Sequence, residues 1–232
     1  MLQSMLTAME VRASEPLDRV NAREMPNLYY IHDPMCSWCY AFAPVWKHVR
    51  EAVAGRVTVK TVLGGLAPDS NEPMPEKTQR YVRRVWRRIE SVVPGTVFNY
   101  EFWERCEPRR STYPACRAVI AARDQGLEHE KAMIAAIQHA YYREARNPSL
   151  PDTLTEIAGE IGLDAPRFAN YLASDVCEQT LQKEIGLARS LDGRGFPSLV
   201  LVSGQAGKQL HHDYNDADLT AQRIDEGIAA LT

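Results

Sequence analysis

The alternation of apolar and polar residues predicts a strand, a helix and a second strand near the start of the chain. The run 27–33 (NLYYIHD) is short and apolar and has a proline on each side, as expected of a buried strand. The segment 38–55 has apolar residues at helical spacing, and 56–63 (RVTVKTVL) alternates like a half-exposed strand. This order predicts a β-α-β unit whose two strands are parallel neighbours.

The middle of the chain predicts a helical block. A loop rich in proline and glycine, 64–76, leads away from the second strand. From 77 to 192 the apolar residues recur at helical spacing, and no strand pattern interrupts them. Pro114 suits the first turn of one of these helices, and Asp152 and Asp164 suit the start of two more.

Strand patterns return near the end of the chain. The run 198–204 is followed by a turn with glycine, a second short strand at 208–212 and an amphipathic helix at 216–232. The complete order is β-α-β, helices, β-β-α. The predicted fold class is therefore α/β, a thioredoxin-like fold with an all-helical domain inserted after the second strand.

This order also predicts the domain organisation. Residues 27–66 and 187–232 would form the thioredoxin-like domain, and 67–186 the inserted helical domain. Residues 1–26 are polar and mixed in charge, and they lack the features of a secretory signal. We interpret them as a flexible leader or a short docking arm.

Composition narrows the function classes. The chain is 45% apolar and 25% charged with a net charge of −3, as in ordinary soluble domains. This balance gives no general attraction to nucleic acid or to a membrane, and no apolar run reaches the ~20 residues that span a bilayer. We expect a cytoplasmic protein that binds neither nucleic acid nor a membrane. The oligomeric state is open, and a homodimer is one possibility.

The stretch HDPMCSWCYAFAP contains the candidate chemistry. Cys36 and Cys39 lie two residues apart in a chain with five cysteines, so they are a redox pair, half of a zinc site or inert packing residues. Zinc usually needs a second such pair or spaced histidines, whereas His211 and His212 are adjacent. We expect no metal site. The other cysteines are interpreted as small buried residues, with a second redox pair as the alternative: Cys106, Cys116 and Cys177.

The position of the pair indicates its chemistry. Cys36 would begin a helix, where unpaired backbone N–H groups and the helix dipole favour a negative charge. A thiolate is the species that attacks disulfides, so this placement indicates Cys36 as the nucleophile. Cys39 lies about one helical turn further on and would resolve the mixed disulfide.

The chain resembles the DsbA family of thioredoxin-fold thiol–disulfide oxidoreductases over residues 27–232, in particular the FrnE-like branch of predicted protein-disulfide isomerases without a signal peptide. CSWC occupies the place of the family CXXC, and Pro44 matches the kinking proline of its helix. GRGFPSLVL resembles the family segment that holds a cis proline, and the helical stretch from residue 139 to Pro197 resembles the family insert.

The resemblance implies a substrate site around the cysteines. Phe196 and Pro197 would face the pair, with a cis peptide bond before the proline that presents the backbone of Phe196 to an extended substrate. Ser37 and Trp38 lie between the cysteines. Trp38 would contact a peptide or glutathione, or pack between helices, and Phe196 would line the groove or join the core.

The chain departs from the DsbA pattern at two points. The strong oxidants have a histidine between the cysteines, and Ser37–Trp38 instead predicts a less oxidising couple. The family also has a buried acid six residues before the nucleophile, a position that Tyr30 occupies here. The proton acceptor for Cys39 is therefore unassigned. His32 and Asp33 are candidates, although both residues could simply end the strand.

Arginines mark two further stretches. The segment 80–90 predicts an amphipathic helix with Tyr81, Val85 and Ile89 on its apolar face and a solvated face, or docking surface for acidic partners, formed by Arg83, Arg84, Arg87 and Arg88. Arg109 and Arg110 precede a predicted helix, where an anion such as a glutathione carboxylate could bind. The alternative is surface charge, with Ser111 and Thr112 as helix caps.

We expect a disulfide reductase or isomerase that acts on protein or glutathione disulfides. It would need no cofactor beyond its redox-active disulfide, with glutathione as a candidate co-substrate. The alternative is a glutathione-dependent transferase or isomerase of the kappa-class or 2-hydroxychromene-2-carboxylate isomerase type. Those enzymes share the fold but have a serine near the position of Cys36 and no resolving cysteine. The third function class that fits the sequence is a non-catalytic binding module.

Overall fold

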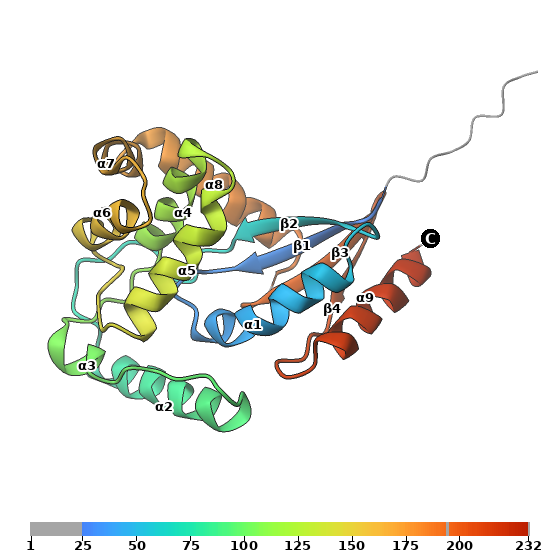
Figure 1. The fold of residues 1–232 in the computed structure, drawn as a ribbon, viewed down its shortest axis with the longest axis horizontal. Helices are drawn as coiled ribbons and strands as arrows, with labels where there is room; N and C mark the ends of the chain where they lie inside the picture. Colours follow the sequence, from blue (N-terminus) through green and yellow to red (C-terminus); the bar gives the residue numbers. More distant parts are fainter. Residues whose placement is uncertain (1–24, 194, 232) are drawn as a thin grey trace, which may run out of the picture.

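A mixed four-stranded sheet is the framework of the protein. The computed structural model describes residues 25–193 and 195–231, and its strands lie in the order β2-β1-β3-β4 (Figure 1). They are β1 (Asn27–His32), β2 (Thr58–Leu63), β3 (Ser198–Ser203) and β4 (Ala206–Leu210). β1 is parallel to β2 and antiparallel to β3, and β3 is antiparallel to β4. The predicted parallel β-α-β unit and the later hairpin are both present.

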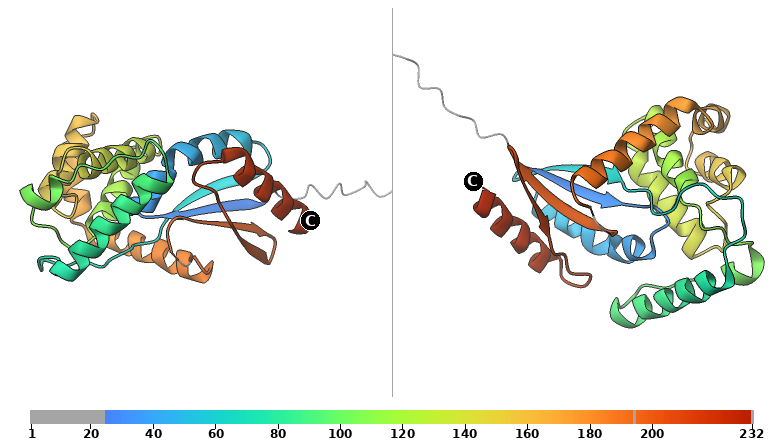
Figure 2. Two further views of the ribbon diagram at one scale, coloured as in Figure 1. Left: turned by 90° about the horizontal axis from the view of Figure 1, so that it is seen from below. Right: turned by 180° about the vertical axis from the view of Figure 1, so that it is seen from behind.

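Helices cover both faces of the sheet. α1 (Ser37–Ala52) and α9 (Ala217–Leu231) pack together on one face, and α8 (Asp175–Ser190) lies on the other (Figure 2). The first face buries Leu28 of β1 and Phe42 of α1, and the second buries Ile31 and Val62 against α8. Both faces of β1 are therefore enclosed, as its continuous apolar run requires.

The remaining helices lie between β2 and β3 in the chain: α2 (Glu76–Val92), α3 (Phe102–Arg105), α4 (Tyr113–Gln125), α5 (His129–Tyr142), α6 (Pro151–Glu160) and α7 (Ala165–Leu172). α4 is the centre of this block and packs against α5, α6, α7 and α8. β1 and β2 run toward the block, so their carboxyl ends meet it (Figure 1). Among the described helices, none is long and apolar enough to cross a membrane.

The helical insertion after the second strand is confirmed. The exact division at 66/67 and 186/187 stays a prediction, and α8 runs across the second boundary while it contacts both β2 and α4. The predicted leader lies outside the described residues, apart from Met25 and Pro26.

Some element boundaries differ from the predicted ones. Asp152 does not cap α6, because the helix begins at Pro151 and Leu150 is its N-cap residue. Asp164 does cap α7, since its side chain accepts a hydrogen bond from the backbone N–H of Arg167 at 2.9 Å. β4 begins at Ala206, earlier than the predicted 208, because a tight turn pairs Ala206 with Ser203. α3 was not predicted, since four residues are too few to show a helical period.

Candidate active site

Cys36 and Cys39 lie at the start of α1, at the carboxyl end of β1. Cys36 is the N-cap residue of the helix, and its carbonyl accepts the first helical hydrogen bond, from the N–H of Tyr40 at 3.0 Å. Both cysteines are free thiols, and the side chain of Cys39 hydrogen-bonds to that of Cys36. Cys36 is 6% exposed and Cys39 is fully enclosed. Cys36 is therefore the outer thiol and Cys39 the inner one.

The surroundings of Cys39 favour its protonated form. Burial raises the pKa of the Cys39 thiol well above its ordinary value, and the hydrogen bond with Cys36 raises it further. The backbone N–H of Asp33 acts in the opposite direction, because it donates to the Cys39 sulfur and stabilises a thiolate there. The surroundings of Cys39 thus favour the neutral thiol.

Phe196 lies against the outer thiol. The Cys36 Sγ is 3.4 Å from the backbone oxygen of Phe196, and the peptide bond between Phe196 and Pro197 is cis. The Phe196 ring packs beside Gly64, where an added Cβ would lie 2.0 Å from Cε1 of the ring. Pro197 is buried behind this contact. The structure therefore brings the predicted residues Cys36 and Phe196 together, and Gly64 leaves the space in which the Phe196 ring fits.

A buried carboxylate anchors the loop before Cys36. Asp33 is fully enclosed, and its Oδ1 accepts a hydrogen bond from the N–H of Met35 at 2.8 Å. Its Oδ2 accepts from the N–H of Leu66 at 2.7 Å and from the Thr112 hydroxyl at 2.6 Å, with the Cys116 thiol at 3.5 Å. Burial raises the pKa of Asp33, and these donors lower it. One side chain thus connects β1, the loop after β2 and the start of α4.

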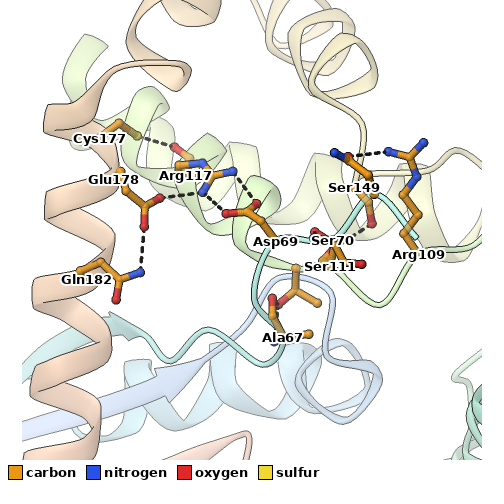
Figure 3. A network of polar contacts seen from close by, with 12 residues as sticks. Ala67, Asp69, Ser70, Arg109, Ser111, Arg117, Ser149, Cys177, Glu178 and Gln182 are labelled. Carbon is orange, nitrogen blue, oxygen red and sulfur yellow. Dashed lines mark hydrogen bonds and ion pairs between the residues drawn. The ribbon is translucent and has the colours of Figure 1, made fainter. Parts of the chain in front are cut away.

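The loop after β2 is also tied to the helical block by polar contacts, many of which Figure 3 shows. Arg117 of α4 binds Asp69 of this loop at 2.7 Å and Glu178 of α8 at 2.7 Å. The N–H of Ala67 donates to Thr112 Oγ1 at 3.0 Å. Thr112 stands at the N-cap position of α4, but its side chain makes no cap hydrogen bond. The prediction of a threonine cap is therefore wrong, because the hydroxyl binds Asp33 instead.

His32, a predicted candidate for the proton acceptor, and Tyr30, which occupies the position of the family acid, are both buried. His32 is 1% exposed, its ring stacks on that of Tyr30 at 5.1 Å, and its Nε2 has no hydrogen-bond partner within the described residues. Burial, together with the charge of Arg123, lowers the pKa of His32 to about 3. Burial raises the pKa of Tyr30 well above its ordinary value. Both side chains are therefore neutral near pH 7.

A groove of about 180 Å³ opens at Cys36. Of the residues predicted to bind substrate, Ser37, Trp38 and Phe196 line this groove and Pro197 does not. Its other walls include Met35, Leu66, Met74, Tyr81, Val82, Val85, Thr112 and Tyr141. Trp38 is half-buried and also packs against Tyr214 of the loop before α9, with the ring centroids 4.9 Å apart, and its contact with a peptide or glutathione stays a prediction.

The charge of this groove is positive. Arg109 and Arg110 line it, and no aspartate or glutamate does. Arg110 is exposed and forms no ion pair with any described residue, whereas Arg109 contacts Asn71 at 3.2 Å and Glu107 at 3.9 Å. An anionic group could therefore bind at Arg110 without displacing an existing partner.

Sequence reasoning missed Tyr142. Its hydroxyl, at the end of α5, donates to the backbone oxygen of Met35 at 2.7 Å, and its ring stacks on Tyr40 at 4.5 Å. A tyrosine within a helical pattern gives no sign of a bond to a residue 107 positions away. Together with Asp33, Tyr142 fixes both backbone groups of the residue before Cys36.

The basic helix and the other cysteines differ in part from expectation. Tyr81 is 58% exposed instead of buried, because α2 turns it toward the mouth of the groove. Arg83 is not on a solvated face; its guanidinium lies 5.1 Å from the ring centroid of Trp103. Cys116 and Cys177 are fully buried as predicted, and Cys106 is half-buried. Within the described part of the chain, no cluster of three or more histidine, cysteine or acidic side chains could hold a metal ion.

Comparison with known proteins agrees with this architecture. A family model described as thioredoxin matches residues 29–219. A curated relative from Bacillus subtilis, named as the ClpXP adapter protein SpxH, is 23% identical over 178 residues, which are 77% of this chain and 58% of that protein. The chain spans less than two thirds of the length of the curated relatives it matches.

Solved structures give the same fold. A proposed protein disulfide isomerase from Nitrosomonas europaea is 28% identical with a TM-score of 0.78, over 90% of this chain and all of that one. The cytosolic disulfide reductase DsbM from Pseudomonas aeruginosa is 24% identical with a TM-score of 0.71, over 88% and 99%. Its structure with GSH is 25% identical with a TM-score of 0.63, over 88% and 96%. The expected thioredoxin-like fold is therefore confirmed, with DsbA-like oxidoreductases among its neighbours.

Proposed function

The chain belongs to the thioredoxin family, and on that basis we propose that it is a DsbA-like thiol–disulfide oxidoreductase in which Cys36 is the nucleophile and Cys39 the resolving thiol. The observation that carries this proposal is the pairing of an outer and an inner thiol at the start of α1, with the outer sulfur 3.4 Å from the backbone oxygen of Phe196. The likeness to a proposed disulfide isomerase, at 28% identity, supports it.

The reaction would proceed in two exchanges. The Cys36 thiolate attacks one sulfur of a substrate disulfide, so a Cys36–substrate bond forms, the substrate S–S bond breaks and the other substrate sulfur leaves as a thiolate. The Cys39 thiolate then attacks Cys36 Sγ and releases the second substrate sulfur. Two electrons pass to the substrate, the protons of both cysteines end on the two released thiols, and the protein is left with a Cys36–Cys39 disulfide.

The geometry orders these two steps. Cys36 borders the groove, where a substrate sulfur can reach it, while enclosed Cys39 reacts only with a sulfur already bonded to Cys36. Cys39 must lose its proton for the second step. The backbone N–H of Asp33 contacts the Cys39 sulfur, and His32 lines the same cavity as Cys39, so we propose that Asp33 or His32 takes part in that proton transfer.

The groove favours disulfides of small anionic thiols. It combines apolar walls, two arginines and no carboxylate, so a glutathione moiety would place its carboxylates at Arg109 and Arg110. The structure of DsbM with GSH, at 25% identity, supports glutathione as a substrate or co-substrate, and protein disulfides with acidic neighbours fit the same chemistry. We propose no further cofactor.

We propose reduction or isomerisation as the direction of the reaction, in a cytoplasmic setting. Ser37 and Trp38 place no cationic side chain between the cysteines, so the reduced form has less stabilisation than in a strong oxidant. The structural neighbour DsbM is described as a cytosolic disulfide reductase, which supports both the reductive direction and the cytoplasmic setting.

Insulin reduction with dithiothreitol or glutathione, and the refolding of scrambled ribonuclease, would test the proposal. We expect Cys36→Ser to abolish both activities and Cys39→Ser to accumulate a mixed disulfide that mass spectrometry detects. Full activity of Cys36→Ser would overturn it. A wild type that conjugates glutathione but leaves disulfides intact would favour the kappa-class alternative. A wild type inert in every assay would favour a binding role, such as that of the relatives named as ClpXP adapters.

A further inference from the structure

A second and larger cavity, of about 700 Å³, lies on the other side of the cysteine pair. It is bounded by β1, β2, α1 and α5, and its walls include Tyr30, His32, Cys39, Trp46, Val59 and Ile134. Cys36 does not line this cavity, and Cys39 does not line the groove at Cys36. The two hollows therefore contact different cysteines.

The inner wall of the cavity is a stack of flat rings. The Tyr30 ring lies between those of His32 and Trp46, at centroid distances of 5.1 Å and 4.4 Å, and the His32 and Tyr30 planes differ by 7°. The stacked rings cover one another's faces, so this wall presents apolar ring edges against which an aromatic molecule can pack edge to face. The volume of the cavity is within the ~300–1,000 Å³ typical of small-molecule sites.

Two polar side chains at this cavity have no hydrogen-bond partner among the described residues. His32 Nε2 is enclosed and makes no hydrogen bond with any described residue. Gln138 is 6% exposed and lines the same cavity, and no hydrogen bond of its side chain occurs within the described residues. Buried polar atoms almost always have a partner, so His32 Nε2 points to a bound molecule or ordered water, and the Gln138 amide, whose atoms are not fully enclosed, lies at the same cavity.

The mouth of the cavity is cationic. Lys47 and Arg50 of α1 and Lys131 of α5 line it, and none of the three forms an ion pair within the part of the chain that the structure describes. Two carboxylates lie among them. The negative charge of Glu130 is balanced by the Arg123 guanidinium, which lies 3.5 Å away. Glu51 has no such ion pair among the described residues. The balance of charge at the mouth is therefore positive and favours an anion.

We propose that this cavity binds a small organic anion with a flat apolar body, such as an aromatic carboxylate or sulfonate. The stack of rings would contact the body, His32 and Gln138 would hydrogen-bond a polar atom at the inner end, and the cations at the mouth would bind the anionic group. This site goes beyond the proposed function, because binding requires no thiol reaction and leaves the groove at Cys36 free.

Fluorescence titration of the full chain with 8-anilinonaphthalene-1-sulfonate would test the proposal, with the uncharged analogue N-phenyl-1-naphthylamine as a matched probe. We expect saturable binding of one sulfonate probe per chain, at least tenfold tighter than the neutral probe. Replacement of Lys47, Arg50 and Lys131 by glutamine should remove that preference. Equal affinity for the two probes, or no saturable binding, would overturn the proposal.

A pair of strand variants would locate the site. Thr61 of β2 lines the cavity, whereas Lys60 does not and points to the opposite face of the strand. We expect Thr61→Trp to fill the cavity and weaken probe binding at least tenfold, while Lys60→Trp leaves it unchanged. Equal effects of both substitutions would contradict the assignment. Cys36→Ser should bind the probe like the wild type, which separates this result from that of the disulfide assays.

Discussion

The hydroxyl of Thr112 lies 2.6 Å from Oδ2 of Asp33, a residue 79 positions earlier in the chain. This bond joins the end of the first strand to the start of α4, and the same carboxylate also receives the backbone N–H groups of Met35 and Leu66. Three segments that border the groove at Cys36 therefore depend on one enclosed side chain.

We expect Asp33→Asn to lower the free energy of unfolding by about 1–3 kcal/mol, because both carboxylate oxygens accept N–H or O–H donors and an amide nitrogen would face one of them. Thr112→Val should lower it by about 1 kcal/mol, since it removes one of these donors. Urea unfolding near pH 7 would measure both. If Asp33→Asn were as stable as the wild type, the carboxylate would not be the anchor of these segments.

His32 predicts a loss of stability in acid. Its pKa is lowered from 6.5 to about 3 by burial, so the folded state binds fewer protons than the unfolded state between these values. The stability that neutral His32 contributes is fully present above pH 6.5 and is lost as the pH falls toward 3. The free energy of unfolding falls by up to ~1.4 kcal/mol per pH unit in this range. Urea unfolding between pH 7 and pH 4 should therefore show a smaller loss in His32→Leu than in the wild type. Parallel pH profiles would contradict this.

Tyr142→Phe should lower the free energy of unfolding by about 1–2 kcal/mol, because it leaves the buried oxygen of Met35 without its hydrogen bond. It should also raise the rate of Cys36 alkylation by iodoacetamide severalfold, since the residue before Cys36 is held less firmly. Tyr141→Phe is the control. The Tyr141 hydroxyl makes no hydrogen bond with the described residues, so this variant should change neither quantity by as much.

Gly64→Ala should displace Phe196. The added Cβ would lie 2.0 Å from the Phe196 ring, so we expect a loss on the order of 2–4 kcal/mol and a clear fall in disulfide-exchange rate. Gly186 of α8 is the matched control, because nothing lies within 4 Å of a Cβ added there. Gly186→Ala should be neutral or add about 0.5–1 kcal/mol. Equal stability of the two alanine variants, measured by thermal or urea unfolding, would argue against this account of Gly64.

Arg110→Gln should raise the KM for glutathione disulfide about tenfold, a loss of ~1.4 kcal/mol, with little effect on the uncharged 2-hydroxyethyl disulfide. The reason is that Arg110 borders the groove and has no ion-pair partner among the described residues. Arg105, which pairs with Glu101 at 3.0 Å outside the groove, supplies the control variant Arg105→Gln. A similar change for both disulfides would contradict an anionic subsite.

The elements of this structure that depend on neighbouring residues in the chain could be predicted from the sequence. The β-α-β unit and the hairpin follow from hydrophobic spacing, and the start of α4 (Tyr113–Gln125) follows from Pro114 in its first turn. The pair of Cys36 and Cys39 at a helix start follows from the same local signals. The exposed position of Tyr81 could not be predicted, because helical periodicity does not show which neighbour a helix packs against.

The anchors of the site could not be predicted either. Asp33 meets Leu66 and Thr112 at separations of 33 and 79 residues, and Tyr142 meets Met35 at 107. These contacts depend on how the helical block folds back on the sheet, which no local pattern specifies. The second cavity is also a product of packing, since its lining comes from two strands and two helices.

The separation between Cys36 and Phe196 has a consequence for synthesis of the protein. The two residues are 160 positions apart, so at about 5–20 residues per second the ribosome adds Phe196 roughly 10–30 seconds after Cys36. During that interval the thiols of Cys36 and Cys39 exist without the segments that later enclose them. The nascent chain therefore carries both thiols for that time without the contact that Phe196 later makes with Cys36.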